Sequence, residues 1–138
     1  MSTVSLQNDP EQDPRVKAVF DDIRATRKTD FINNMWRYLA FDASLLESTW
    51  AEVKRVMAMP SSLDPLTKEM LYITASIING CSYCVHSHTA AATAKGMTGE
   101  QYAELLSIVA LASKTNQLAT ALQVPVDSAF DLSTLART

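Results

Sequence analysis

Apolar residues recur along this chain at intervals of three and four positions, the spacing that gathers them on one face of an α-helix. Only three glycines and five prolines interrupt the pattern, and apolar residues mostly avoid the strict alternation typical of strands. The pattern predicts an all-α chain, a helical bundle of about six helices. We expect the helices at about residues 14–27, 31–39, 43–59, 65–78, 81–96 and 99–123.

Capping residues mark the predicted ends of these helices. An Asp or Thr side chain can accept a hydrogen bond from a first-turn N–H, and proline fits the first helical position because its missing N–H would have no partner there. Candidate N-caps are Asp13 before Pro14, the pair Thr29-Asp30, Asp42, Asp64 before Pro65, and Thr98, which fits a capping box with Gln101. Asn79-Gly80 predicts a turn between the fourth and fifth helices, and Gly96 predicts the end of the fifth.

The apolar faces of the second and third helices identify candidate core residues. These are Phe31, Ile32, Met35, Trp36 and Leu39, followed by Leu45, Leu46, Trp50, Val53 and Met57. Both ends of the chain are weakly patterned. We expect residues 1–12 to form a mobile or partner-draped arm, and Phe130, Leu132 and Leu135 to pack on this chain or on another subunit.

Length and charge narrow the classes of protein. A chain of 138 residues most simply forms one domain, residues 1–138. The formal net charge is -3 and no basic block is present, so we expect no nucleic-acid partner. The N-terminus does not resemble a secretory signal, and no apolar run approaches the roughly 18 residues of a membrane span. We therefore expect a cytoplasmic protein without a membrane partner. In the reducing cytoplasm a C-x-x-C pair is typically catalytic or metal-binding.

Every cysteine and every histidine of the chain lies within residues 81–88. Each helical residue turns about 100° around the axis, so Cys84 lies about 60° from Cys81 and His88 about 40° from Cys84. Two thiols and one imidazole therefore share a face. His86 lies about 160° from His88 and points away from both thiols. We expect His86 to be an exposed or interface residue without a catalytic role.

Glu69 is predicted to join this cluster from the preceding helix. If the fourth and fifth helices run antiparallel about Asn79-Gly80, a residue about ten positions before the turn lies level with one about ten positions after it. Glu69 then lies beside His88. A carboxylate there would orient the imidazole and raise its basicity. The sequence thus predicts a proton path through Cys84, His88 and Glu69.

The two thiols suit two-electron redox chemistry. A helix N-terminus favours the thiolate, and a second thiol one turn away can close an intramolecular disulfide before over-oxidation occurs. His88, one turn beyond Cys84, gives that thiol the nearer base. We therefore expect Cys84 to attack the oxidant. Cys81, nearer the helix end, is expected to resolve the intermediate and to exchange with a reductant.

The spacing of these residues also resembles a known family. A glutamate, eleven intervening residues and then C-x-x-C-x-x-x-H are matched by Glu69, Cys81, Cys84 and His88. The chain, over about residues 60–125, is similar to the AhpD-like alkylhydroperoxidase branch of the carboxymuconolactone decarboxylase family. The resemblance implies reduction of hydroperoxides by an antioxidant peroxidase, through a Cys81–Cys84 disulfide that a dithiol donor recycles. It implies an all-α fold and a homo-oligomer, often a trimer or hexamer. We expect no cofactor.

Tyr83 departs from the family pattern. Well-studied members of the family have a second histidine directly before the second cysteine, where this chain has Tyr83. Its hydroxyl can donate a hydrogen bond there, but with a reference pKa of ~10 it is a poor base near neutral pH. We expect at most an auxiliary role for it. The decarboxylases that name the family lack the cysteine pair, so Cys81 and Cys84 argue against that activity.

Three other readings of the cluster stay open at this point. Cys81, Cys84 and His88 could bind zinc, with Glu69 or water as the fourth ligand. The cysteines could instead be two buried small apolar residues. A structural or regulatory oligomer of the same fold would perform no turnover. The peroxidase reading, with no bound metal, is the prediction.

Overall fold

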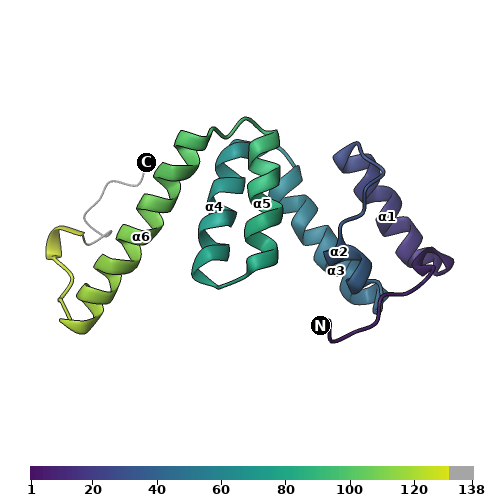
Figure 1. Ribbon diagram of the computed structural model, residues 1–138, viewed down its shortest axis with the longest axis horizontal. Helices are drawn as coiled ribbons and strands as arrows, with labels where there is room; N and C mark the ends of the chain where they lie inside the picture. Colours follow the sequence, from purple (N-terminus) through teal and green to yellow (C-terminus); the bar gives the residue numbers. More distant parts are fainter. Residues whose placement is uncertain (131–138) are drawn as a thin grey trace. The chain divides into compact units, whose positions relative to one another are not determined.

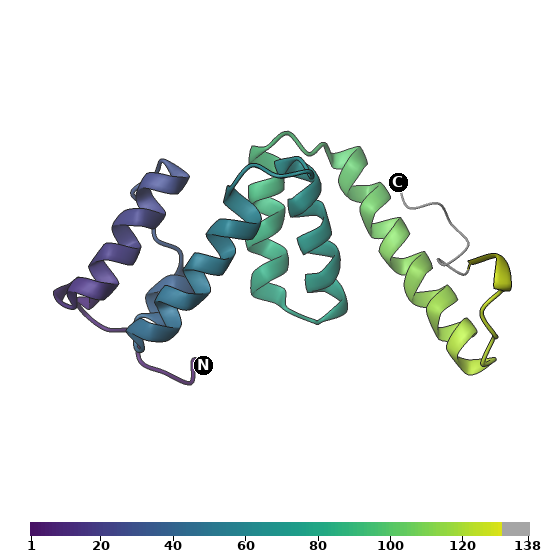
Figure 2. The same cartoon turned by 180° about the vertical axis from the view of Figure 1, so that it is seen from behind.

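The computed structural model describes residues 1–130, which contain helices and no strand (Figures 1 and 2). The α-helices are α1 (Pro14–Arg27), α2 (Asn34–Leu39), α3 (Ala43–Val53), α4 (Pro65–Ile78), α5 (Ser82–Ala94) and α6 (Gly99–Ala121). The shorter elements are the 3-10 turns η1 (Pro10–Gln12) and η3 (Ser128–Phe130) and the π-helical turn η2 (Lys54–Ala58). The predicted all-α architecture is confirmed. Two of the expected packing residues, Leu132 and Leu135, lie outside the described residues.

The chain divides into two compact units, Met1–Lys68 and Glu69–Thr138. The prediction of one domain over residues 1–138 stays a prediction. Within the described part of the chain, no helix combines the length and the apolar character that crossing a membrane requires. In the segment predicted as an arm, Pro10–Gln12 form η1, and Glu11 binds the Arg24 guanidinium at 2.5 Å.

The first unit buries an apolar core between α1, α2 and α3. The buried residues are Val16, Val19, Phe20, Ile23, Trp36, Ala40, Leu46 and Trp50. The rings of Trp36 and Trp50 meet edge to face, with centroids 5.4 Å apart. The Trp50 indole N–H donates to the Asp22 carboxylate at 2.7 Å, so this large side chain is buried with its polar group satisfied.

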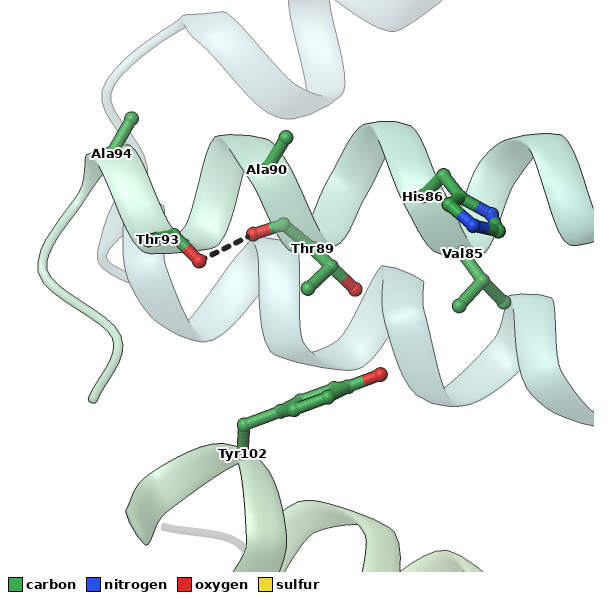
Figure 3. Close-up of a pocket in the computed structure, with 7 residues that line it drawn as sticks. All are labelled: Val85, His86, Thr89, Ala90, Thr93, Ala94 and Tyr102. Atoms are coloured by element: carbon green, nitrogen blue, oxygen red, sulfur yellow. Dashed lines mark hydrogen bonds between the residues drawn. The ribbon is translucent and has the colours of Figure 1, made fainter. Parts of the chain in front are cut away.

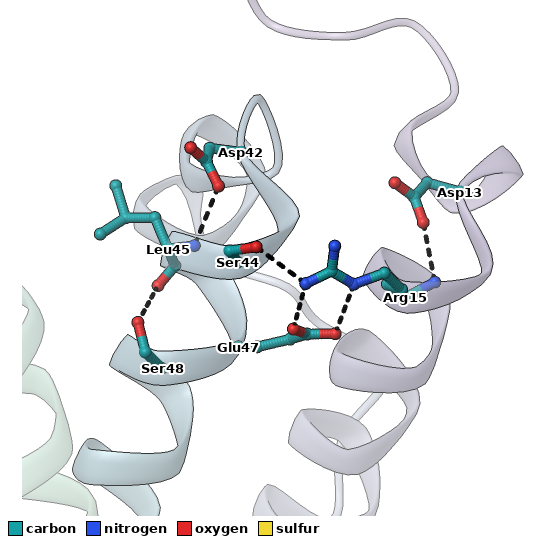
Figure 4. A network of polar contacts seen from close by, with 7 residues as sticks. All are labelled: Asp13, Arg15, Asp42, Ser44, Leu45, Glu47 and Ser48. Carbon is teal, nitrogen blue, oxygen red and sulfur yellow. Dashed lines mark hydrogen bonds and ion pairs between the residues drawn. The ribbon is translucent and has the colours of Figure 1, made fainter.

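Polar contacts at the helix starts follow the predicted caps. Asp13 accepts from the N–H of Arg15, and Asp42 accepts from the N–H of Leu45 (Figure 4). In the same figure the Arg15 side chain reaches from α1 to Glu47 on α3, with its Nε 2.9 Å from the carboxylate. The Arg15–Glu47 pair is exposed, so it contributes little to the free energy of unfolding and mainly orients α1 on α3.

The prediction for α2 was wrong at its start. The helix begins at Asn34, not after Thr29-Asp30, because Lys28 takes a left-handed conformation (φ 54°) and the chain then runs irregularly to Asn33. Phe31 consequently precedes the helix and is 69% exposed. Met35 and Leu45, also predicted inside, are 43% and 44% exposed.

The second unit is built on a hairpin of α4 and α5, which run side by side in both Figure 1 and Figure 2. The Asp64 carboxylate caps α4 by accepting from the N–H of Thr67, as predicted. Thr98 and Gln101 form the predicted capping box of α6. Beyond its buried Leu105 and Val109, α6 leaves most of its apolar side chains exposed, including Ile108 at 60%.

Candidate functional site

The turn between α4 and α5 positions the first cysteine. Gly80 takes a left-handed conformation (φ 70°), the conformation that glycine adopts without steric cost. The N–H of Cys81 donates to the carbonyl of Ser76 at 2.9 Å, and that of Gly80 donates to Ile77, which is the hydrogen-bond pattern of a Schellman motif. Cys81 therefore closes α4 and, as the N-cap of α5, opens the next helix.

Cys81 and Cys84 form a disulfide, with their Cα atoms 5.3 Å apart. The Cys81 sulfur also accepts from the backbone N–H of Cys84, at 3.2 Å, in place of the oxygen of an ordinary N-cap. Both residues are half-buried. The unpaired N–H groups at a helix start favour negative charge, so this position stabilises a Cys81 thiolate when the bond is reduced.

Glu69 and His88 meet as the hairpin geometry predicted. The Nδ1 of His88 lies 2.7 Å from the Glu69 Oε2, across 19 positions of sequence. An ionised carboxylate can only accept, so Nδ1 carries the proton of this contact. In the neutral ring Nε2 is then the basic nitrogen, the one that can take a proton from a thiol.

Two further residues hold this pair, and the sequence reasoning missed both. Tyr72, on α4, stacks on the His88 ring with centroids 3.7 Å apart and an interplanar angle of 20°. Lys95, the C-cap of α5, places its Nζ 3.0 Å from the Glu69 Oε1. Helical spacing contained a signal for each, because Tyr72 lies three positions from Glu69 and Lys95 lies seven positions from His88.

Glu69 is the buried charge of the site, with its side chain 8% exposed. Burial raises the pKa of Glu69, but hydrogen bonds from His88 and Lys95 and the charge of Lys95 lower it more, so the net pKa lies below the usual value of 4.5. The carboxylate is therefore ionised at neutral pH. It is a fixed acceptor to which His88 of α5 and Lys95, the C-cap of that helix, both donate.

His86 lies apart from this cluster, as predicted. Its Nδ1 is 2.8 Å from the carbonyl of Ser82, and its side chain faces an open pocket of about 740 Å³ (Figure 3). The lining residues are Val85, His86, Thr89, Ala90, Thr93 and Ala94 of α5 and Tyr102 of α6. The lining therefore contains no cysteine, and neither Glu69 nor His88.

The model of one protein family matches residues 43–127, which is more than half of the chain. It describes the carboxymuconolactone decarboxylase family. The chain belongs to this family. The matched range begins at α3 and extends beyond α6, so it contains the whole hairpin and its disulfide.

Two members named for AhpD are similar to this chain. The crystal structure of an alkylhydroperoxidase AhpD core from Rhodospirillum rubrum superimposes with a TM-score of 0.90 and is 61% identical, covering 94% of this chain and 97% of that one. The alkyl hydroperoxide reductase AhpD of Corynebacterium kroppenstedtii is 34% identical over 71 residues. That match spans 49% of this chain and 41% of the relative's length. The predicted family and AhpD-like fold are confirmed.

Tyr83 occupies the position where the resemblance expects a histidine in AhpD-like members. It lies in the first turn of α5 and is 42% exposed.

Among the described residues, no group of three or more Cys, His, Asp and Glu side chains is placed to hold a metal ion. The thiols that a zinc site would need are joined to each other. What the hairpin offers is a disulfide one turn from a histidine whose proton is held by a buried carboxylate.

Proposed function

We propose that this chain is a thiol-dependent peroxidase that reduces organic hydroperoxides through the Cys81–Cys84 pair, with His88 and Glu69 as its proton relay. The observation that carries the proposal is the disulfide at the start of α5, one turn before a histidine bound by Glu69 at 2.7 Å. The names of the two AhpD relatives support the same activity.

In the first step the Cys84 thiol loses its proton to the Nε2 of His88, and the thiolate attacks the terminal oxygen of the hydroperoxide. The O–O bond breaks as the S–O bond forms, so cysteine is oxidised to sulfenic acid and the hydroperoxide is reduced. The alkoxide that leaves takes a proton from the imidazolium and departs as an alcohol. Glu69 keeps the other ring nitrogen protonated throughout.

In the second step the Cys81 thiol gives up its proton and its sulfur attacks the Cys84 sulfenic sulfur. The S–O bond breaks as the disulfide forms, and the leaving hydroxide takes up that proton and departs as water. The N-cap position of Cys81 supports this role, because the N–H of Cys84 stabilises charge on its sulfur. A dithiol donor, either a small molecule or a partner disulfide reductase, then attacks the disulfide. The donor is oxidised, and both protein thiols are restored. None of these steps needs a cofactor.

We further propose that the working form is a homo-oligomer, a trimer or hexamer, in the cytoplasm. Apolar side chains exposed along the second half of α6 support assembly, and the exposed fractions of Leu111, Leu118 and Leu122 are 61%, 52% and 73%. The cytoplasm keeps a reduced thiol pool that can recycle the disulfide. Light scattering coupled to size-exclusion chromatography tests the assembly, and a monomer at micromolar concentration would contradict it.

Thiol titration before and after one equivalent of cumene hydroperoxide tests the activity. The reduced wild type is expected to lose both thiols within minutes. Cys84→Ser should keep its remaining thiol, whereas Cys81→Ser should stop at a sulfenic acid on Cys84 that dimedone traps. Retention of both thiols by the wild type with excess oxidant would overturn the proposed function. A sulfenic acid trapped on Cys81 would reverse only the order of the two cysteines.

A further inference from the structure

The Glu69 carboxylate divides its two oxygens between two residues of α5. Oε2 faces the Nδ1 of His88 at 2.7 Å, and Oε1 faces the Nζ of Lys95 at 3.0 Å. With one oxygen held by Lys95, rotation of the carboxylate about its terminal bond is restricted. The oxygen that His88 uses therefore stays directed at the ring.

Position in α5 alone does not explain the direction of the Lys95 side chain. A cation at a helix C-terminus is favourable because it offsets the helix dipole, and Lys95 is the C-cap of α5. That effect needs only charge near the last turn. The Lys95 side chain instead reaches Glu69 on α4, 26 positions away in the sequence, and is only 38% exposed.

The geometry points to Lys95 as a positioning residue of the proton relay, which holds Glu69 ionised and aligned so that His88 keeps its Nδ1 proton. This assignment rests on the proposed function. Lys95 does not touch the thiols or the substrate in this scheme. It acts through Glu69, and Glu69 acts through His88.

The charges around Glu69 determine in which direction its pKa moves when the charge of Lys95 is removed. Among the described residues the charged groups that act on this carboxylate are His88 and Lys95, both on α5. Tyr72, the titratable neighbour on α4, stacks on His88, and the nearby Lys68 directs its Nζ to the carbonyl of Met59. Burial alone raises the pKa of Glu69, so removing the Lys95 charge must move that pKa upward.

Carbon-13 NMR of the Glu69 carboxyl group and the pH profile of thiol oxidation by cumene hydroperoxide together test the role. In Lys95→Met, which keeps the length of the side chain but not its charge, the Glu69 titration should move to higher pH by about one unit. The acid limb of the rate profile should move the same way, which lowers the rate about tenfold below that limb. Lys95→Arg should restore both, and Lys17→Met, which removes the exposed Lys17–Asp21 pair of α1, should change neither.

An unchanged Glu69 titration in Lys95→Met would overturn the assignment. A moved titration with an unmoved rate profile would overturn it too, because Lys95 would then not act on the relay. Equal rate losses in the Met and Arg variants, with wild-type pH dependence, would also overturn it, as they would indicate a purely structural role. Failure of the wild type to consume peroxide would overturn the proposed function itself, and is recognised before any variant is compared.

Discussion

The two units of this chain both bury apolar side chains, but the hairpin of the second unit also buries a carboxylate. Residues 1–68 bury apolar side chains, including the edge-to-face pair Trp36 and Trp50. In the hairpin of the second unit the best-connected buried side chain is a carboxylate, Glu69, bound by His88 and Lys95. Apolar burial is non-directional, whereas a buried charge is favourable only when its partners are in place. The hairpin therefore depends on the placement of particular polar partners in a way that the apolar core of the first unit does not.

The largest expected effect is in the apolar unit. Phe20→Ala removes a ring that is 2% exposed and should lower the free energy of unfolding by about 3–5 kcal/mol. Both tryptophans of the chain lie in this unit, so urea denaturation followed by tryptophan fluorescence reports on it. The control is Phe31→Ala, the same change at a 69% exposed position, expected within about 0.5 kcal/mol of wild type. Similar losses in both variants would contradict the assignment of the core.

The next effect is in the hairpin. Glu69→Gln keeps the side-chain shape but removes the buried charge that both His88 and Lys95 contact, which should cost about 2–3 kcal/mol in the helical unfolding transition followed by circular dichroism. Thiol oxidation should slow about 100-fold, because a neutral amide can also donate to Nδ1 and no longer holds His88 in the tautomer whose Nε2 is basic. The exposed Glu104 on α6 provides the control, Glu104→Gln, which should change neither. An equal shift of the tryptophan transition would show that the two units do not unfold separately.

A smaller effect is expected when the pH is lowered, because the contribution of the Glu69 contacts to the free energy of unfolding depends on pH. Because the pKa of Glu69 lies below 4.5 in the folded protein, its ion pairs stabilise the fold fully above about pH 4.5 and are lost as pH falls through the lower folded value. The difference in unfolding free energy between wild type and Glu69→Gln should therefore shrink toward zero in that acid range. Urea titrations at several pH values measure it. A difference that stays constant down to pH 2 would contradict the ion-paired state.

Local signals in the sequence were sufficient for most of the helix ends. The caps at Asp13, Asp42, Asp64 and Thr98 each act within three residues, so neighbouring letters determine them. The start of α2 is different. Thr29-Asp30 is a good capping sequence, but Lys28 ends α1 in a left-handed conformation, the chain then runs irregularly to Asn33, and the Asn33 side chain accepts from the Arg27 guanidinium.

The candidate site was predictable as far as helix periodicity reaches. Counting along an antiparallel hairpin brought Glu69 to His88, because backbone rise is uniform. Tyr72 and Lys95 depend on side-chain conformation. The seven-residue spacing places Lys95 on the same face of α5 as His88, but the lysine also had an adequate local explanation at its helix end, so its contact with Glu69 did not follow from the sequence.

The length of the turn at Gly80 fixes the register of α5 relative to α4, and with it the geometry of the site. Asn79-Gly80 sets the rotation of α5 relative to α4, and therefore the direction in which His88 of α5 faces Glu69 of α4. One residue inserted in this turn would change where α5 starts relative to α4, which is expected to direct His88 away from Glu69 while both helices stay intact. Length variation in this short connection is therefore expected to remove peroxide reduction without unfolding the hairpin, so the number of residues in the turn matters as much as their identity.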